Sequence, residues 1–242
     1  MRFDVLTLFP DMIESTINDS ILKRAIDKKI IEVNIINFRA FSDNKHLTVD
    51  DYAYSGGKGM LIRFDPIVRA LKTIPGYEKA LKILTTPSGV LYNQERARNI
   101  STKYDHIIII CGHYEGIDAR ILNYVDLELS IGDYILTGGE LAASIIIDSV
   151  SRLIPGVISE GSTDIESFEN NLLEYPQYTR PQSYDGYEVP EILISGHHAN
   201  IKKWQHRESL KKTYLMRPDL LEKADLSAED KLIIEEIKNE EK

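Results

Sequence analysis

The chain has 242 residues, of which 43% are hydrophobic, and a formal net charge of −9. This length and composition exclude a disordered or fibrous protein, and they predict one good core with a smaller appendage. The only cysteine, Cys111, excludes an internal disulfide and a cysteine-based zinc site, which is typical of a reducing compartment. The opening MRFDVLTLFPDM lacks a cleavage site, and no stretch approaches the roughly 18 apolar residues of a membrane span. We therefore expect a cytoplasmic protein without a membrane partner.

The first part of the chain predicts strands that alternate with helices. After Pro10, for example, three- and four-residue spacing of apolar residues predicts a helix through Ile13, Ile17, Ile21, Leu22 and Ile26. The strand-like runs are apolar without alternation, as is typical of strands buried on both faces, so this alternation predicts a mostly parallel α/β sheet. Five runs rich in β-branched residues are the expected strands: 3–9, 31–37, 81–86, 106–111 and 125–130.

The composition changes after Pro155. The sequence GVISEGSTDIESFENN is rich in glycine, serine and acidic residues, which predicts a flexible linker. Beyond it we expect helices over the basic segment 197–217 and near 227–239. The predicted organisation is an α/β domain over 1–158, a linker over 159–171 and a small, mostly helical domain over 172–242.

The segment 197–217 is basic although the protein is acidic. It holds six basic residues and one acid, a net charge of +5, so the rest of the chain carries about −14. Such a run is usually a solvated helix face, but it also has the character of a contact with a nucleic-acid backbone. The candidates for phosphate contacts are Lys202, Lys203, Lys211 and Lys212.

Three glycine-containing loops follow successive predicted strands: TTPSG (85–89), CGHYEG (111–116) and SIGDYILTGGE (130–140). Ligands of a parallel α/β sheet bind beyond the carboxyl ends of its strands. If these strands are neighbours, the three loops converge on one pocket. Glycines that only form turns are the alternative interpretation.

The contents of this predicted pocket follow from its residue types. Neither GxGxxG nor GxxxxGK[ST] occurs, which disfavours NAD and ATP. The loops offer backbone groups, the aromatic Tyr114 and Tyr134, and the acids Glu115, Asp118 and Asp133. This combination suits an uncharged heterocycle joined to a cationic group, as in S-adenosylmethionine.

Longer motifs resemble a known family. GHYEGIDARI, SIGDYILTGGELAA, RLIPGV, YPQYTRP, VPEILISGHHANIKKW and MRPDLL occur in this order after RFDVLTLFPDM. Together they resemble the bacterial tRNA (guanine-N1)-methyltransferases, the TrmD family, from end to end. The resemblance implies an α/β fold of the SPOUT class with a deep trefoil knot, and an obligate homodimer whose active sites are shared between subunits. It also implies S-adenosylmethionine as cofactor, and magnesium for methyl transfer, for which no protein ligands are assigned.

The implied substrate is the guanosine immediately 3′ of the anticodon in a subset of tRNAs, when another guanosine precedes it. Its methylation gives 1-methylguanosine, which helps maintain the reading frame. By the resemblance, the loop from Ser130 to Leu136 holds adenine through its backbone. The implied cofactor residues are Thr85, Thr86, Pro87, Ser88, Gly89, Gly112, Tyr114, Glu115, Ser130, Ile131, Gly132, Tyr134, Ile135, Leu136, Gly138, Gly139 and Glu174.

The resemblance also implies the residues of catalysis. The family base is an aspartate in a D-S-F motif; this chain has ESF, which assigns the base to Glu166 and leaves Asp164 as the alternative. Arg152 matches the arginine that stabilises the guanine oxygen. Asp50 and Gly59, in DDYAYSGGKGML, match the loop that recognises the target base.

Three other functions remain as alternatives. The closest is another SPOUT methyltransferase that acts on a ribose oxygen or a different base. A non-catalytic RNA-binding module on the same fold is the second, but it would not need Arg152 or an acid in the linker, and both are present. A phosphate-binding nucleotide enzyme would need one of the glycine motifs that do not occur.

Overall fold

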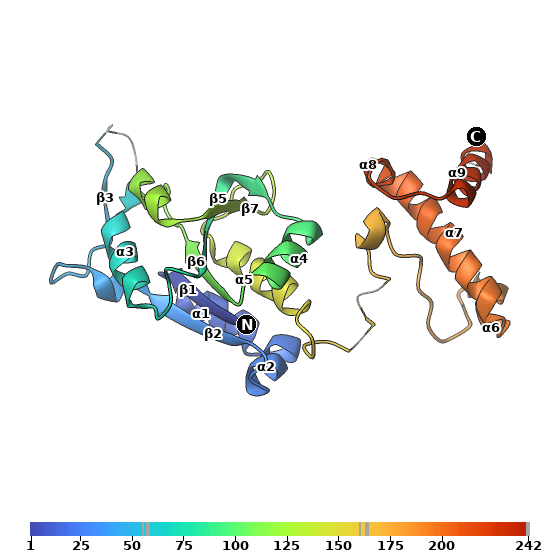
Figure 1. Cartoon of the computed structure of the whole chain (residues 1–242), viewed down its shortest axis with the longest axis horizontal. Coiled ribbons are helices and arrows are strands. Elements are labelled where there is room, and N and C mark those ends of the chain that lie inside the picture. Colours follow the sequence, from blue (N-terminus) through green and yellow to red (C-terminus); the bar gives the residue numbers. More distant parts are fainter. Residues whose placement is uncertain (55, 57–58, 160, 163–164, 241–242) are drawn as a thin grey trace. The chain divides into compact units, whose positions relative to one another are not determined.

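A computed structural model of the protein describes residues 1–54, 56, 59–159, 161–162 and 165–240. The chain divides into two compact units, Met1–Glu160 and Gly161–Lys242 (Figure 1). Within the described ranges, none of the helices combines the length and the apolar character that a bilayer crossing needs.

The first unit is built on a sheet of five parallel strands, which confirms the predicted mostly parallel α/β architecture. The strand order is β2-β1-β6-β5-β7, so the three strands that precede the glycine-containing loops are neighbours. The bounds are β1 Arg2–Thr7, β2 Glu32–Asn37, β5 Leu81–Leu91, β6 His106–Cys111 and β7 Leu127–Ser130.

Helices cover both faces of this sheet (Figure 1). Successive residues of the buried strand β6 point to opposite faces: Ile107 and Ile109 join one hydrophobic core and Ile108 and Ile110 another. The first core is closed by α1 Pro10–Ile17, α2 Ser20–Asp27, α4 Gln94–Lys103 and α5 Glu140–Ser151, and the second by α3 Phe64–Thr73 and the 3₁₀ helices η1 Phe38–Phe41 and η2 Ala119–Tyr124. The central strands are therefore buried on both faces, as their apolar runs predict.

The second unit is mostly helical and has a small core of Leu210, Ile234 and Ile237. The helices predicted over the basic segment and near 227–239 are confirmed as α7 and α9. The elements are η3 Glu169–Asn171, β8 Ser183–Tyr184, β9 Tyr187–Glu188, α6 Glu191–Ile194, α7 His198–Met216, α8 Pro218–Leu221 and α9 Ala228–Glu240.

Leu173, just after the predicted linker, is hydrogen-bonded to α7. The Leu173 N–H donates to Thr213 Oγ1 at 2.8 Å, and Ser209 Oγ donates to the Leu173 carbonyl at 2.6 Å. The Glu174 N–H donates to Ser167 Oγ at 3.0 Å, so the serine of the ESF motif is bound to the same segment.

Asp230 joins α7 to the start of α9. Its carboxylate lies against His206 Nε2, accepts from the Ser227 N–H at 2.9 Å, and its own N–H donates to Ser227 Oγ at 3.1 Å. This is a capping box, which satisfies N–H groups that a helix start leaves unpaired. Burial raises the pKa of Asp230, but the hydrogen bonds from His206 and Ser227 outweigh it and leave the pKa below its ordinary value.

We expect Asp230→Asn to destabilise the second unit by about 1 kcal/mol at pH 7, because the helix cap is weakened. A carboxylate whose folded pKa is depressed stabilises the fold above its unfolded pKa and loses that contribution as the pH falls through the folded value. The difference between wild type and variant should therefore shrink below about pH 4. Urea unfolding followed by Trp204 fluorescence measures it, since Trp204 is the only tryptophan; a gap that is constant down to pH 3 would contradict the assignment.

Candidate active site

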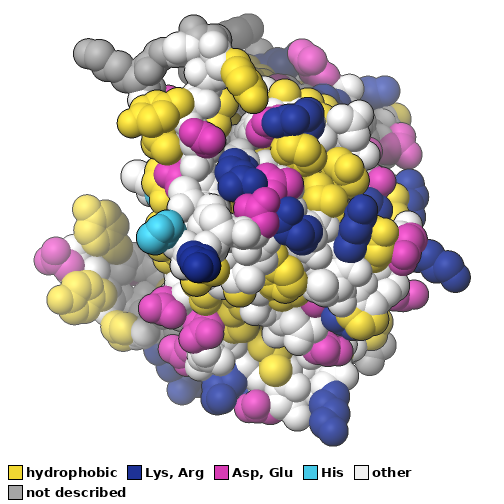
Figure 2. Space-filling view, turned by 90° about the vertical axis from the view of Figure 1, so that its left-hand side faces the viewer, with side chains coloured by type: hydrophobic (Ala, Val, Ile, Leu, Met, Phe, Trp, Pro, Cys, Tyr) yellow, Lys and Arg dark blue, Asp and Glu magenta, His cyan; other side chains and the backbone are white. Residues whose placement is uncertain are grey.

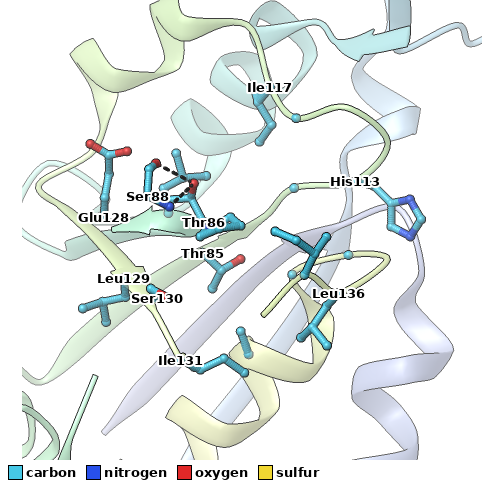
Figure 3. A pocket seen from close by; sticks show the side chains of 18 of the residues that line it. Thr85, Thr86, Ser88, His113, Ile117, Glu128, Leu129, Ser130, Ile131 and Leu136 are labelled. Carbon is cyan, nitrogen blue, oxygen red and sulfur yellow. Dashed lines mark hydrogen bonds between the residues drawn. The ribbon is translucent and has the colours of Figure 1, made fainter. Parts of the chain in front are cut away.

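The three loops line one pocket at the carboxyl edge of β5, β6 and β7, which confirms their predicted convergence (Figure 3). The cavity has a volume of about 480 Å³, within the range of small-molecule sites. Fifteen of the seventeen residues assigned to the cofactor line it; Gly89 and Glu174 do not. The fifteen that line the cavity are Thr85, Thr86, Pro87, Ser88, Gly112, Tyr114, Glu115, Ser130, Ile131, Gly132, Tyr134, Ile135, Leu136, Gly138 and Gly139.

The first loop is a bulge within a strand, which corrects the expectation that strand three ends before it. Pairing with Leu129 shifts from Thr85 to Val90, so residues 86–89 leave the ladder and β5 resumes beyond them. Thr86 Oγ1 and Ser88 Oγ lie 3.0 Å apart and form the hydrogen bond drawn in Figure 3. A Cβ at Gly89 would lie 2.5 Å from the Leu129 nitrogen, so this glycine lets two backbones approach rather than lining the pocket.

The third loop is shaped by its own polar groups. Ser130 Oγ accepts from the Gly132 N–H and donates to the Gly132 carbonyl, both at 3.2 Å, and the Tyr134 hydroxyl donates to the Ile131 carbonyl at 3.2 Å. Gly132 has φ +151°, and a Cβ there would lie 2.3 Å from the Tyr134 ring. The side chains of Ser130 and Tyr134 are thus hydrogen-bonded to the loop backbone. Ile131, Ile135 and Leu136 of the same loop line the cavity.

The second loop is joined to a hairpin that the sequence did not predict. Strands β3 Asp50–Tyr52 and β4 Met60–Ile62 pair in antiparallel fashion. The Glu115 N–H donates to the Met60 carbonyl at 3.2 Å, and the Ile62 N–H donates to the Gly116 carbonyl at 2.9 Å. A Cβ at Gly59 would lie 2.4 Å from Glu115 Cγ, so Glu115 packs directly over that glycine. The segment matched to base recognition therefore lies against the pocket loop through Gly59 and Glu115, although neither Asp50 nor Gly59 lines the cavity.

The acids of the pocket differ from those expected. Only Glu115 of the three named acids lines the cavity; Glu128 of β7, which was not predicted, lines it as well (Figure 3). Asp118 is paired instead with Arg120, 2.6 Å from Nη2, and this hydrogen bond lowers the pKa of its carboxyl. Asp133 is not among the lining residues.

The face over α3 and the β3–β4 hairpin carries basic and acidic side chains intermixed (Figure 2). On α3 and before it, Arg63 lies 2.9 Å from Asp65 and 3.2 Å from Asp43, and Arg69 lies 2.8 Å from Asp65. These hydrogen bonds hold the pKa of the Asp65 carboxyl below its ordinary value, although burial opposes the shift. Arg63 and Arg69 are thus already paired with acids, which disfavours these two arginines as the main phosphate contacts.

The remaining predicted residues belong to different parts of the chain. Arg152 follows α5 in the first unit, whereas Glu166 and Glu174 belong to the second. The Glu174 carboxylate accepts from Gln177 Nε2 at 2.7 Å, and its carbonyl accepts from Lys212 Nζ at 3.1 Å. Lys202 and Lys203 are exposed on α7, and Lys211 is half-buried there. Asp164, the alternative base, lies outside the described residues.

A metal site does not emerge from the described part of the chain. No group of three or more His, Cys, Asp or Glu side chains comes together there in a way that could hold an ion.

Comparisons with known proteins agree with these motifs. Residues 1–223 match the family model described as tRNA (Guanine-1)-methyltransferase TrmD. Relatives named tRNA (guanine-N(1)-)-methyltransferase include those of Mycoplasma capricolum, 48% identical with 100% of both chains covered, and Dictyoglomus turgidum, 48% identical over 99% of this chain and 98% of the relative. That of Caldanaerobacter subterraneus is 51% identical over 98% of each chain. The match spans nearly the whole sequence, and this chain belongs to the tRNA (guanine-1)-methyltransferase TrmD family.

Proposed function

We propose that the protein methylates N1 of guanosine in tRNA, at the position immediately 3′ of the anticodon, with S-adenosylmethionine as the methyl donor. Family membership supports the reaction class, and the product is 1-methylguanosine in a subset of tRNAs. The observation that carries the proposal is the single pocket formed by the three loops, because it occurs in a chain whose motifs all match one family.

The pocket residues fit this cofactor. Adenine needs backbone donors and acceptors, and the loop from Ile131 to Leu136 lines the cavity with its chain held by Ser130 and Tyr134. The carboxylates of Glu115 and Glu128 suit the positive charges of the sulfonium and ammonium groups. S-adenosylmethionine, when bound, supplies an electrophilic methyl group.

The chemistry required of the protein is removal of a proton. Guanine N1 is protonated at neutral pH and is then a poor nucleophile, so a base must accept its proton as the reaction proceeds. We assign this role to Glu166. Arg152 stabilises the negative charge that spreads to the guanine oxygen once N1 loses its proton.

A homodimer with shared active sites is part of the proposal. The pocket and Arg152 belong to the first unit, whereas Glu166 and Glu174 belong to the second, so residues from both units are needed. Helix α5 leaves Leu141 and Ile145 about half exposed at a spacing of four residues, as expected for a helix face that packs against another subunit. A cytoplasmic location fits a tRNA-modifying enzyme.

A trefoil knot is also part of the proposal. The loop that ends at Gly139 passes close to the end of β6: the Gly139 N–H donates to the Gly112 carbonyl at 2.8 Å, and His113 and Gly138 form an antiparallel bridge. Close passage of a later segment past β6 is what a knotted crossing at the pocket requires.

Incubation with S-adenosylmethionine and an unmodified tRNA, followed by digestion and mass analysis of the nucleosides, tests the reaction. We expect 1-methylguanosine. A ribose-methylated nucleoside or another methylated base would favour a different SPOUT methyltransferase, and unmodified tRNA that still binds would favour a non-catalytic RNA-binding module.

The basic helix α7 gives a further prediction. The double variant Lys202→Gln/Lys203→Gln should weaken tRNA binding and reduce the slope of log Kd against log salt by about 1 to 2, because each phosphate contact releases counterions. Cofactor affinity should not change. Lys223→Gln/Lys231→Gln, which removes two exposed charges of the same unit outside the basic segment, is the matched control. Binding titrations at several salt concentrations measure both slopes. Equal slopes for the two double variants would show that the basic segment is a solvated helix face and not a phosphate contact.

A further inference from the structure

A buried carboxyl group lies beneath the pocket and takes no part in the proposed chemistry. Glu140 is the first residue of α5 and is 1% exposed. Its Oε1 accepts a hydrogen bond from Thr7 Oγ1 of β1 at 2.7 Å, but its Oε2 has no donor among the described residues. A buried carboxyl oxygen without a donor is unfavourable, so its surroundings should contain one.

The nearest ring nitrogens belong to a histidine at the wall of the pocket. His113 lines the cavity, on the opposite side from Glu128 (Figure 3). Its ring contacts those of Phe9, with centroids 4.5 Å apart, and Tyr114, 5.3 Å apart. Its Nδ1 is buried and, within the described ranges, has no hydrogen-bond partner.

The side chains that carry these two unpartnered atoms border the same small space, and the edge of the His113 ring that faces it holds Cδ2 rather than Nδ1. A Cβ on Gly138 would lie 2.4 Å from Glu140 Oε2 and 2.4 Å from His113 Cδ2, so both side chains border the small space beside that glycine. A half-turn of the imidazole about its Cβ–Cγ bond exchanges Cδ2 with Nδ1 and turns the ring nitrogen toward this space. One rotation therefore brings a donor toward the carboxyl oxygen that lacks one.

We infer that His113 is a positioning residue for the cofactor pocket, which donates a hydrogen bond from Nδ1 to Glu140 across Gly138. The bond joins the second loop to the start of α5, next to the hydrogen bond from the Gly139 N–H to the Gly112 carbonyl. It fixes the turn at residues 137–139, and with it the end of the loop whose backbone lines the cavity. Gly138 is required to be glycine because any side chain would occupy the path of this bond.

This inference rests on the proposed function for its consequence, which is cofactor affinity. His113→Phe keeps an aromatic ring against Phe9 but removes the donor, whereas His113→Asn loses the ring and keeps an N–H donor at the Nδ1 position. Calorimetric titration of the full-length variants with S-adenosylmethionine should show affinity about tenfold weaker for His113→Phe, as for loss of a hydrogen bond to a carboxylate. His113→Asn should remain within about threefold of wild type, and KM for the cofactor should rise in His113→Phe while kcat stays close to wild type.

Wild-type affinity in His113→Phe, or equal losses in both variants, would overturn the inference. A second measurement does not depend on the cofactor or on the affinity of any variant. In wild-type protein labelled with ¹⁵N-histidine, His113, assigned by its loss from the spectrum of His113→Asn, should carry its proton on Nδ1, protected from exchange; an unprotonated Nδ1 would overturn the assigned bond. If wild type does not bind S-adenosylmethionine, the proposed function fails, while the nitrogen spectrum still decides the bond itself.

Discussion

Glu166→Gln is expected to lower the single-turnover rate of methyl transfer by about 10²- to 10⁴-fold, the range of a general base. Glutamine keeps the size and hydrogen-bonding capacity of the side chain but cannot accept the N1 proton. Binding of cofactor and of tRNA should persist. Rapid-quench measurements with enzyme in excess over tRNA separate this chemical step from binding and product release.

Asp164→Asn is the matched control, because it removes one negative charge two residues away. Its rate should remain near that of wild type. A larger loss in Asp164→Asn than in Glu166→Gln would assign the base to Asp164 and shift the motif register by two residues. Wild-type rates for both variants would show that neither acid of this segment is the general base.

Gly112→Val is expected to weaken S-adenosylmethionine binding by at least about tenfold while the protein remains folded. Gly112 lines the pocket, and a Cβ there would meet its nearest neighbours, on Ile117, at 3.7 Å, an ordinary contact. The added methyl groups therefore fill space that the ligand needs without disturbing the core. Calorimetric titration gives the affinity, and thermal unfolding gives the stability.

Gly139→Val provides the contrast. A Cβ at this position would lie 2.1 Å from Thr85 Oγ1 and 3.0 Å from the Cys111 Cα, and the backbone of β6 cannot yield as a side-chain end can. We expect a lower unfolding midpoint as well as lost binding. If Gly112→Val binds the cofactor as wild type does, the ligand does not occupy the cavity between the three loops.

The local patterns predict the parallel sheet because its strands are unusually apolar. HIIIIC reads as a strand buried on both faces, and β6 is one. Hydrophobic periodicity does not predict the end of a helix that is interrupted locally, or a strand of only a few residues. Ile13 to Ile26 keep helical spacing, yet α1 ends at Ile17 and Asp19 begins a second helix by accepting from the Ser20 N–H at 2.6 Å. Hairpin β3–β4 has only three residues in each strand, too few for a period to be recognised.

The site is predictable to the extent that it depends on loops after strands. TTPSG, CGHYEG and SIGDYILTGGE come together because β5 lies between β6 and β7, an order that the sequence alone does not contain. Glu128 could not be predicted as a pocket residue, because whether it lines the cavity depends on which face of β7 its side chain occupies. Glu140 could not be predicted for a similar reason: only packing against β1 places its carboxyl beside Thr7 and away from solvent.

The most direct test of the account uses two tRNA transcripts that differ in one nucleotide, the residue before the guanosine immediately 3′ of the anticodon. Each is incubated with the protein and S-adenosylmethionine, cut at defined positions and analysed by fragment mass. We expect one added methyl group on N1 of the target guanosine when guanosine precedes it, and little or none when adenosine does. A methyl group at another position in the transcript, or on an atom other than N1, would contradict it.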